Sequence, residues 1–367
     1  LFAGNGVVLK PSEKTPLVGQ LLADLLTEAG IPEDLLQVVQ GPGEPTGRSL
    51  VEAGPDLLVF TGSVATGRKV ATELAGQLTP HVLELGGKDP MLVLDDADLD
   101  LAARGAAWGA FTNAGQTCAA VERIYVHEDV AQPFLDRVVA QAQAIRVGRG
   151  DAPGTDMGPM IDQDARAACH AQVEDARKHG ATVLTGGEPL DELGPTYYPP
   201  TVLTDVTPEM VVMREETFGP VLPIQVVADD EEALALANDS PYGLSASVWT
   251  TDRTRGLAIA RRLTAGTVTL NDCLYTYAAC ETPWGGAKDS GHGHTHGRWG
   301  LLAMTRLKHI NRARPRRAGS PWYFPYDEDL DRVADEGFEF LYGSKLKGLK
   351  AAGPLLRRFR DLDPGDR

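Results

Sequence analysis

Short apolar runs alternate with longer segments of mixed polarity between residues 6 and 270. Apolar runs bounded by turn residues are typical of buried parallel strands. The expected strands cover residues 6–9, 36–39, 57–60, 81–85, 90–94, 123–126, 221–227, 245–249 and 266–270. Apolar residues at helical spacing predict helices over residues 16–29, 46–53, 99–110, 128–145 and 231–238, one helix that ends near residue 77, and a helix–strand pair within 165–184. This alternation predicts an α/β doubly wound fold.

The strand that ends at Leu85 divides this pattern into two α/β lobes. We expect residues 1–85 to form the first lobe and residues 86–290 the second, with residues 291–312 as a returning segment. No internal repeat and no low-complexity linker interrupts them. Because the chain begins at Leu1 and runs directly into a core strand, we also expect residues ahead of Leu1.

Residues 313–367 differ in character from the two lobes. Arginines cluster at positions 312, 314, 316 and 317, and the aromatic stretch 322–326 follows them. Further on, Lys345, Lys347, Lys350, Arg357 and Arg358 alternate with Leu346, Leu349, Leu355 and Leu356. The favoured interpretation is a solvated tail that packs its aromatics on the body. A membrane-surface helix is the alternative, although Gly348, Gly353 and Pro354 interrupt it.

Composition narrows the functional classes. The chain has 367 residues, 43% of them hydrophobic, and a net charge of −16. Nucleic-acid binding needs a basic face, so this charge argues against it. No apolar run reaches membrane-spanning length, and no signal peptide is visible. The four cysteines form no paired pattern, which favours a reducing cytoplasm over a disulfide framework.

Cys118 closes the stretch Phe111-Thr112-Asn113-Ala114-Gly115-Gln116-Thr117-Cys118. This stretch ends a helix of small residues and presents one cysteine from a glycine-containing turn. Most free cysteines are small buried hydrophobes, and a nucleophile needs a special environment. Both interpretations are open for Cys118 taken alone.

Three other positions carry polar groups where chemistry could use them. Glu84 ends an apolar strand, where a buried carboxylate must be paired, protonated or used, and burial raises its pKa. Lys10 and Glu13 follow the first strand and could bind the ribose of an adenosine. Gly62 and Ser63 lie between a strand and a helix, where amides can bind an anion. Each could equally be structural: a salt bridge at Glu84, or ordinary turns at the others.

His292, His294 and His296 alternate in a glycine-rich loop. Three such histidines could bind a metal, but no carboxylate lies at ligand spacing. We expect no metal site.

Several motifs in order resemble the aldehyde dehydrogenase superfamily from about Val7 to Ile310. They are Val8-Leu9-Lys10-Pro11-Ser12-Glu13 with Thr15-Pro16, Phe60-Thr61-Gly62-Ser63 with Gly67, Leu83-Glu84-Leu85-Gly86-Gly87-Lys88, Gly115-Gln116-Thr117-Cys118, Glu215-Glu216-Thr217-Phe218-Gly219-Pro220, Tyr242-Gly243-Leu244, Asn271, and Pro283-Trp284-Gly285-Gly286-Ala287-Lys288 with Ser290-Gly291. The resemblance implies a Rossmann-type cofactor domain (1–85), an α/β catalytic domain (86–290), and a return and oligomerisation strand (291–312) that belongs to a β arm. It assigns no role to residues 313–367.

The resemblance also implies a role for each matching residue. Cys118 would be the nucleophile and Glu84 the base. Lys10, Ser12 and Glu13 would line the cofactor site, with Lys10 and Glu13 at the adenine ribose. Gly62 and Ser63 would face the pyrophosphate. Glu216 would bind the nicotinamide ribose beside Phe218, and Asn271 would lie near the catalytic centre.

The implied reaction is oxidation of an aldehyde to a carboxylic acid with NAD or NADP, through a thioester on Cys118 that Glu84 helps to hydrolyse. Glu13 favours NAD because its carboxylate repels a 2′-phosphate. The resemblance further implies a homodimer or homotetramer, and an N-terminal part with an oxyanion-hole asparagine that is absent here. Two alternatives stay open: a truncated or non-catalytic subunit with this fold, and a cofactor-free thiol esterase.

The substrate is not readable from the sequence. Trp108, Phe111, Tyr275 and Tyr277 could line a funnel for an apolar aldehyde. Core packing explains them equally well.

Overall fold

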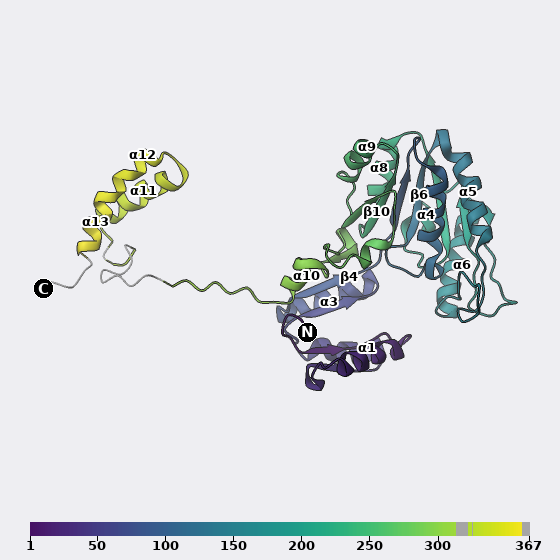
Figure 1. Cartoon of the computed structure of the whole chain (residues 1–367), viewed down its shortest axis with the longest axis horizontal. Coiled ribbons are helices and arrows are strands. Elements are labelled where there is room, and N and C mark those ends of the chain that lie inside the picture. The colour runs from purple at the N-terminus through teal and green to yellow at the C-terminus, as the bar shows by residue number, and fades with distance from the viewer. Residues whose placement is uncertain (313–321, 325, 362–367) are drawn as a thin grey trace. The chain divides into compact units, whose positions relative to one another are not determined.

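The computed structural model describes residues 1–312, 322–324 and 326–361, and the predicted arginine cluster at 314–317 lies outside these residues. The chain forms two compact units, Leu1–Arg306 and Leu307–Arg367 (Figure 1). The expected α/β fold is confirmed for the first unit.

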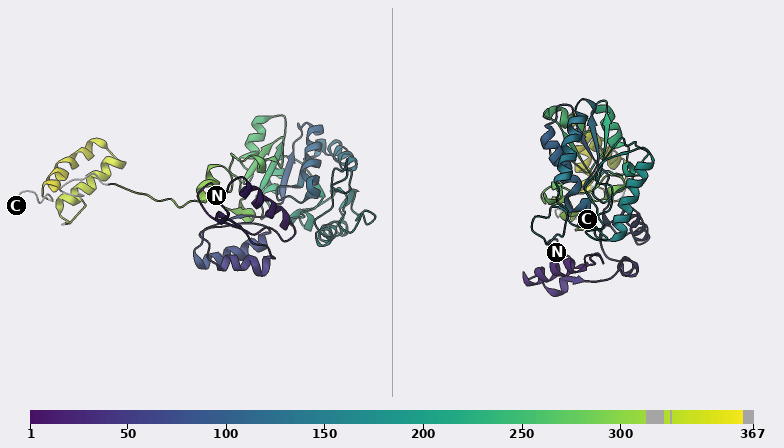
Figure 2. Two further views of the ribbon diagram at one scale, coloured as in Figure 1. Left: turned by 60° about the horizontal axis from the view of Figure 1, so that its bottom comes forward. Right: turned by 90° about the vertical axis from the view of Figure 1, so that its right-hand side faces the viewer.

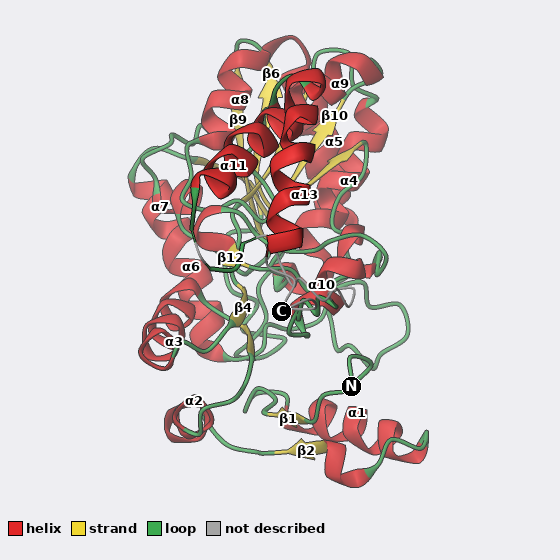
Figure 3. Ribbon diagram, turned by 90° about the vertical axis from the view of Figure 1, so that its left-hand side faces the viewer, coloured by secondary structure: helices red, strands yellow, loops and turns green. Residues whose placement is uncertain are grey.

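The first lobe contains two small sheets. Its elements are β1 (Val7–Leu9), α1 (Pro16–Glu28), β2 (Leu36–Val38), α2 (Arg48–Glu52), β3 (Leu58–Thr61), α3 (Val64–Gln77) and β4 (His81–Glu84). β1 pairs with β2 in parallel, while β3 pairs with β4 in parallel and β4 with the short β12 (Gly291–His292) in antiparallel (Figure 3). The strands of this lobe therefore form two separate sheets, because no described strand forms a ladder between β1–β2 and β3–β4.

The second lobe is built on one seven-stranded sheet with the order β11-β10-β5-β6-β9-β8-β7. Its strands are β5 (Asp89–Val93), β6 (Val121–His127), β7 (Thr182–Thr185), β8 (Thr201–Thr204), β9 (Val221–Val227), β10 (Ser245–Trp249) and β11 (Thr267–Leu270). Only the edge strand β7 pairs in antiparallel. The other strands of this sheet run parallel to one another. They therefore all begin at one edge of the sheet and end at the other.

Helices cover both faces of this sheet (Figure 1, Figure 2). They are α4 (Leu99–Phe111), α5 (Ala131–Ala144), α6 (Gln163–Lys178), α7 (Val211–Arg214), α8 (Asp230–Asn238) and α9 (Arg253–Ala260). β5 is buried along its whole length, and β6 is buried except at His127. Burial on both faces explains why these strands are apolar runs without alternation.

Two α-helices and one strand of the second lobe were missed by the pattern of apolar residues. One of the helices, α7, has only four residues. β8 has only four residues and lies among prolines and threonines, too short for a clear period. α9 begins with Arg253-Thr254-Arg255-Gly256, so it lacks an apolar stripe, and Asp252 caps it by accepting hydrogen bonds from two backbone N–H groups.

The returning segment contains β12 and α10 (Gly297–Ala303), and residues 304–312 form no strand in the part of the chain that the structure describes. The predicted oligomerisation role of residues 291–312 stays a prediction.

The second unit is helical, in contrast to the expected tail. It contains α11 (Glu328–Tyr342), α12 (Lys345–Gly348), the short 3₁₀ helix η7 (Leu349–Ala351) and α13 (Ala352–Asp361). The interrupting residues mark helix boundaries: Gly348 ends α12, and Pro354 lies in the first turn of α13, where its missing N–H is harmless. No helix among the described residues is long and apolar enough to cross a membrane.

Candidate active site

The edge at which the parallel strands begin, here called the amino edge, brings the predicted catalytic residues together. Cys118 lies just before β6, and Glu216 lies just before β9. Glu84 ends β4, and the segment 85–88 leads from it into β5. Both carboxylates act electrostatically on the thiol of Cys118. Three residues that are far apart in the sequence thus form one site.

The turn that presents Cys118 depends on left-handed backbone. Asn113 and Ala114 have φ of 54° and 55°, and Gly115 has φ of 71°. A Cβ on Gly115 would lie 2.3 Å from the carbonyl oxygen of Gly219, so only glycine allows this approach. The turn is therefore fixed against the segment that carries Glu216.

The thiol of Cys118 is partly buried in apolar surroundings. It packs against the buried cluster of Ala119, Leu244 and Trp284. Burial raises the pKa of Cys118 to about 11, and the charges of Asp89, Glu216 and Glu84 add to the rise. At neutral pH the thiol is protonated, so attack on a carbonyl requires a base that takes its proton.

Glu84 has the properties of such a base. Its side chain is 7% exposed, and neither carboxylate oxygen completes a hydrogen bond with a described residue. Burial raises the pKa of Glu84 to about 7, while the side chains of Thr295 and Trp284 oppose the rise. A carboxylate poised near neutral pH is typical of a general base.

Glu216 lies in the segment before β9, and its carboxylate is close enough to Cys118 to raise the pKa of the thiol. It accepts a hydrogen bond of 3.1 Å from the backbone N–H of Gly87. A Cβ on Gly87 would lie 2.6 Å from the carbonyl oxygen of Cys118. Glycine at this position therefore lets segment 85–88 approach the turn that carries Cys118. Burial, followed by the charge of Glu122, raises the pKa of Glu216 to about 7.

A buried ion pair beneath the site was missed by the sequence reasoning. Lys88 Nζ donates to Glu122 Oε2 at 2.7 Å and to Thr217 Oγ1 at 2.9 Å. Glu122 also accepts from the backbone N–H groups of Thr217 and Phe218. The pair therefore ties the segment of Glu216 to the strand that follows Glu84. A charged residue inside the apolar run of β6 is the signal that could have revealed it, because such a charge must be paired.

The predicted adenosine-binding residues lie together at the ends of β1 and β2. Lys10 Nζ donates to the backbone oxygens of Pro11 and Gly41 at 2.8 Å and to Glu13 Oε2 at 3.4 Å. The side chain of Glu13 is half exposed, and the side chain of Ser12 accepts from a backbone N–H. Hydrogen bonding from its own backbone, and then Lys10, lowers the pKa of Glu13.

Gly62 and Ser63 lie directly before α3, and Gly62 contacts Glu84. The N–H of Gly62 donates to the carbonyl of Glu84 at 3.1 Å. Ser63 caps the helix by accepting from the N–H of Thr66. Within residues 1–312, no hydrogen bond or ion pair joins this pair to Lys10, Ser12 or Glu13. Phe218 is 41% exposed and also has positive φ.

Asn271 lies at a strand end and binds the neighbouring strand. It follows β11, and its side chain makes two hydrogen bonds to the backbone of Thr250, which follows β10. Both residues belong to the edge at which the parallel strands end, here called the carboxyl edge. Asn271 thus ties two strand ends together there, while Leu274, three residues further on, packs against the same apolar cluster as Cys118. A role for Asn271 near the catalytic centre stays a prediction.

The four aromatic residues predicted to line a substrate funnel differ in burial. Phe111 is buried in the core of the second lobe, so its role is packing. Trp108, Tyr275 and Tyr277 are about half exposed. The ring of Tyr277 meets that of Trp284 edge to face at 5.5 Å, which connects it to the apolar cluster around Cys118.

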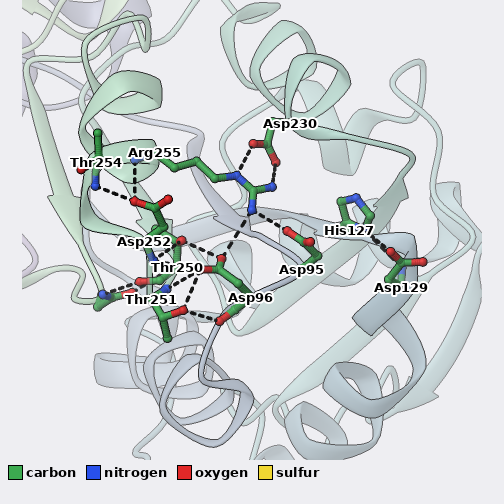
Figure 4. Close-up of polar contacts among 11 residues, drawn as sticks. Asp95, Asp96, His127, Asp129, Asp230, Thr250, Thr251, Asp252, Thr254 and Arg255 are labelled. Atoms are coloured by element: carbon green, nitrogen blue, oxygen red, sulfur yellow. Dashed lines mark hydrogen bonds and ion pairs between the residues drawn. The ribbon is translucent and has the colours of Figure 1, made fainter.

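The carboxyl edge holds a network centred on Arg255 (Figure 4). Its guanidinium donates two hydrogen bonds to Asp230 and one to Asp95, each 2.6 Å long. Asp96 accepts from Thr250 and Thr251. Burial opposes ionisation of Asp96, but these hydrogen bonds outweigh it and lower its pKa to about 2. The carboxylates of Asp95, Asp96 and Asp230 are therefore each satisfied by hydrogen bonds.

The histidine loop lies beside Glu84, since β12 pairs with β4. His296 contacts the rings of Trp284 and Tyr277. Among the residues that the structure describes, no group of three His, Cys, Asp or Glu side chains is arranged to hold a metal ion.

Comparison with known proteins gives a consistent result. The model of the aldehyde dehydrogenase family matches residues 1–310. A Mycolicibacterium smegmatis protein, whose name describes an NADP(+)-dependent succinate-semialdehyde dehydrogenase, is 44% identical over 315 residues, 86% of this chain and 61% of its own. A Methylomonas protein named 4,4'-diapolycopene aldehyde oxidase is 40% identical over 364 residues, 99% of this chain and 67% of its own.

A solved structure agrees with these sequences. The crystal structure of an NAD-dependent aldehyde dehydrogenase from Sinorhizobium meliloti superimposes with a TM-score of 0.82 at 39% identity, covering 87% of this chain and 63% of that one. The chain spans about three fifths of the length of the first of these relatives.

Proposed function

The chain belongs to the aldehyde dehydrogenase family, and on that premise we propose that it oxidises an aldehyde to a carboxylic acid with Cys118 as nucleophile and Glu84 as base. One observation carries the proposal. Glu84, a buried carboxylate with a pKa of about 7, is close enough to Cys118 to raise the pKa of its thiol.

The reaction uses these two residues in sequence. The sulfur of Cys118 bonds to the carbonyl carbon while Glu84 takes the thiol proton. A nicotinamide cofactor, when bound, supplies the acceptor for the hydride that leaves this carbon. A thioester on Cys118 remains. Glu84, after releasing its first proton to solvent, takes a proton from water as the water oxygen attacks, the carbon–sulfur bond breaks, and the acid leaves. General-base assistance of this kind contributes about 10²–10⁴-fold in rate.

The residues present fit a dinucleotide. Lys10 and the half-exposed Glu13 lie at the carboxyl ends of two parallel strands, where such cofactors bind. The N-terminus of α3, a helix of fourteen residues that begins directly after Gly62 and Ser63, offers amides for a diphosphate. Glu216, near Cys118, would hold the second ribose.

We propose that NAD is preferred over NADP. The pKa of Glu13 is lowered, so its carboxylate is ionised at neutral pH and repels a 2′-phosphate. The name of the Mycolicibacterium relative specifies NADP(+), which makes this preference worth measuring. Glu13→Gln removes the carboxylate that repels the 2′-phosphate. It should therefore lower the ratio of kcat/KM for NAD to kcat/KM for NADP.

The proposed substrate is an uncharged aldehyde. Cys118 packs against apolar side chains, and the charges that raise its pKa all belong to carboxylates. A carboxylate on the substrate, as in succinate semialdehyde, would be repelled there.

The test is a matched pair of substrates with NAD and NADP: butanal and succinate semialdehyde, which share a chain length. The proposal expects NADH formation with higher kcat/KM for butanal. Equal or better use of the semialdehyde would overturn the substrate assignment, while no NADH with any aldehyde would favour the non-catalytic subunit. Ester hydrolysis without cofactor, together with no NADH, would favour the thiol esterase.

We further propose a homo-oligomer in the cytoplasm. The four cysteines are free in the structure, which suits a reducing compartment. Sedimentation velocity would distinguish a dimer or tetramer from a monomer.

A further inference from the structure

Residues 216–219, here called the Glu216 segment, are bound by one buried carboxylate. The backbone N–H of Thr217 donates to Glu122 Oε2 at 2.8 Å, and that of Phe218 donates to Glu122 Oε1 at 2.9 Å. Glu122 is 3% exposed, and Lys88 supplies the opposite charge at 2.7 Å. A single side chain of β6 therefore fixes the direction of two consecutive N–H groups.

Helix α6 holds the same segment through Gln172. Its Oε1 accepts from the hydroxyl of Thr217 at 2.7 Å, and its Nε2 donates to the backbone carbonyl of Glu216 at 3.2 Å. The same hydroxyl accepts from Lys88 Nζ at 2.9 Å. Side chains from β6, from α6 and from the segment 85–88 thus all bind the Glu216 segment.

Phe218 has a backbone conformation that needs such support. Its φ of 49° lies in the left-handed region, which is unfavourable for a residue with a Cβ. Consecutive N–H groups that converge on one anion commonly combine right-handed and left-handed backbone. The carboxylate of Glu122 therefore stabilises the conformation that Phe218 adopts. The ring of Phe218 stays 41% exposed, so these contacts hold the backbone and leave the ring accessible to a ligand.

The Glu216 segment also lies against the turn that presents Cys118. A Cβ on Gly115, which belongs to that turn, would lie 2.3 Å from the carbonyl oxygen of Gly219. Gly219 directly follows Phe218 in the chain. An exposed aromatic ring is therefore held close to the thiol, where the proposed reaction needs a planar hydride acceptor, and aromatic rings stack on planar rings.

We propose that Glu122 and Gln172 are positioning residues for cofactor binding. They hold the Glu216 segment so that the ring of Phe218 and the carboxylate of Glu216 meet the nicotinamide half of a dinucleotide. Neither residue touches the cofactor, since both side chains are engaged by the segment itself. A segment fixed before binding lowers the entropy cost of ordering it. This inference rests on the proposed function.

Three variants of the whole chain test these contacts. Glu122→Gln replaces the carboxylate with a neutral amide, but it leaves Lys88 unpaired and lowers stability. Gln172→Leu removes both hydrogen bonds from α6 without changing any charge, so the test depends mainly on this variant. The matched control is Gln225→Leu in β9, where the side-chain Oε1 has no hydrogen-bond partner among the described residues.

The first readout needs no cofactor. Hydrogen exchange of the peptide that contains the Glu216 segment is followed by mass spectrometry. Exchange should be at least about tenfold faster in Glu122→Gln, which weakens the N–H hydrogen bonds directly, and at least about threefold faster in Gln172→Leu. The Gln225 variant should exchange this peptide at the rate of the wild type.

The second readout is the dissociation constant of NAD, measured by titration calorimetry without an aldehyde. It should rise at least about tenfold in Glu122→Gln and Gln172→Leu, since a displacement of about 1 Å at a positioned group can cost about 100-fold. The Gln225 variant should bind NAD as the wild type does.

Three results would overturn the proposal: unchanged exchange in Gln172→Leu, faster exchange with unchanged affinity for NAD, or equal effects in the Gln225 variant. Each would leave the proposed function intact as long as the wild type forms NADH from an aldehyde. Turnover by Cys118→Ala would instead contradict the proposed function, without changing the exchange rates and affinities that test Glu122 and Gln172.

Discussion

The two edges of the seven-stranded sheet use the same residue types with opposite results. At the amino edge, Glu84 and Glu216 are buried and their pKa values rise to about 7. At the carboxyl edge, Arg255 lowers the pKa of Asp95, and hydrogen bonds lower the pKa of Asp96 to about 2 despite its burial. Ligands of open α/β sheets usually bind at the carboxyl edge. Here that edge carries the ion pairs of Arg255, and the proposed catalytic groups lie at the other.

The difference follows from what the neighbouring segments supply. Asp96 receives donors from Thr250, Thr251 and the backbone N–H of Asp252, so its charge is compensated. Glu84 lies in an apolar strand and completes no hydrogen bond with a described residue. An uncompensated carboxylate destabilises the fold when it ionises, and the same property allows it to take up a proton near neutral pH. Stability and reactivity are therefore separated between the two edges.

The largest effect should come from removing the nucleophile. Cys118→Ala is expected to lower the rate of aldehyde oxidation by about 10⁴-fold or more, the scale on which a lost nucleophile acts. The readout is NADH formation at 340 nm, with the circular dichroism spectrum as a check of folding. Cys280→Ala, which changes an exposed cysteine, should retain the activity. Substantial turnover without the Cys118 thiol would remove the amino edge as the site of chemistry.

Removing a carboxylate charge should raise the free energy of unfolding at the amino edge and lower it at the carboxyl edge. Because the pKa of Glu84 is raised from 4.5 to about 7, its ionisation lowers the free energy of unfolding as pH rises through that window. Glu84→Gln should therefore be more stable than the wild type at pH 8, by roughly 2–3 kcal/mol. Below pH 4 the difference should vanish.

Asp96 has the opposite sign. Its pKa is lowered from 3.8 to about 2, so its charge adds stability above pH 4, and this is lost as pH falls toward 2. Asp96→Asn should cost roughly 2 kcal/mol at pH 8. Urea denaturation of both variants at two pH values measures the pair. The same sign for both substitutions would mean that the contrast between the edges is wrong.

The smallest effect concerns one hydroxyl group at each edge. The side chain of Thr295 opposes the rise in the pKa of Glu84. Thr295→Val should therefore shift the pH at which kcat is half maximal upward from about 7, by less than one unit. Thr250→Val removes a hydroxyl from Asp96 and should leave this midpoint unchanged. A shift in the Thr250 variant, or a downward shift in the Thr295 variant, would argue against Glu84 as the titrating group.

The sequence predicted the elements around the site better than the contacts within it. Apolar runs predicted β5, β6, β9 and β10 because these strands are buried on both faces. Cys118 and Glu84 are predicted as catalytic residues from ordered motifs, and the structure brings them together. The pairing of Lys88 with Glu122 was not, because it joins residues 34 positions apart, and no local pattern encodes such a contact.

Other features also depend on the fold as a whole. The direction of β11 decides which edge Asn271 occupies, and its side chain binds Thr250 there. The second unit was expected to be a tail because glycine and proline interrupt its pattern. Gly348 instead ends α12, and Gly353 and Pro354 lie in the first turn of α13.

The central claim is that Glu84 hydrolyses a thioester formed on Cys118. The most direct measurement is the intact mass of Glu84→Gln after mixing with an aldehyde and NAD, together with the NADH released. We expect NADH to stop at about one equivalent and to form more slowly than with the wild type, because the thiol also loses its base. We also expect a steady-state rate lowered about 10²–10⁴-fold and an acyl group on the peptide that contains Cys118. An undiminished steady-state rate with no adduct on that peptide would contradict the account.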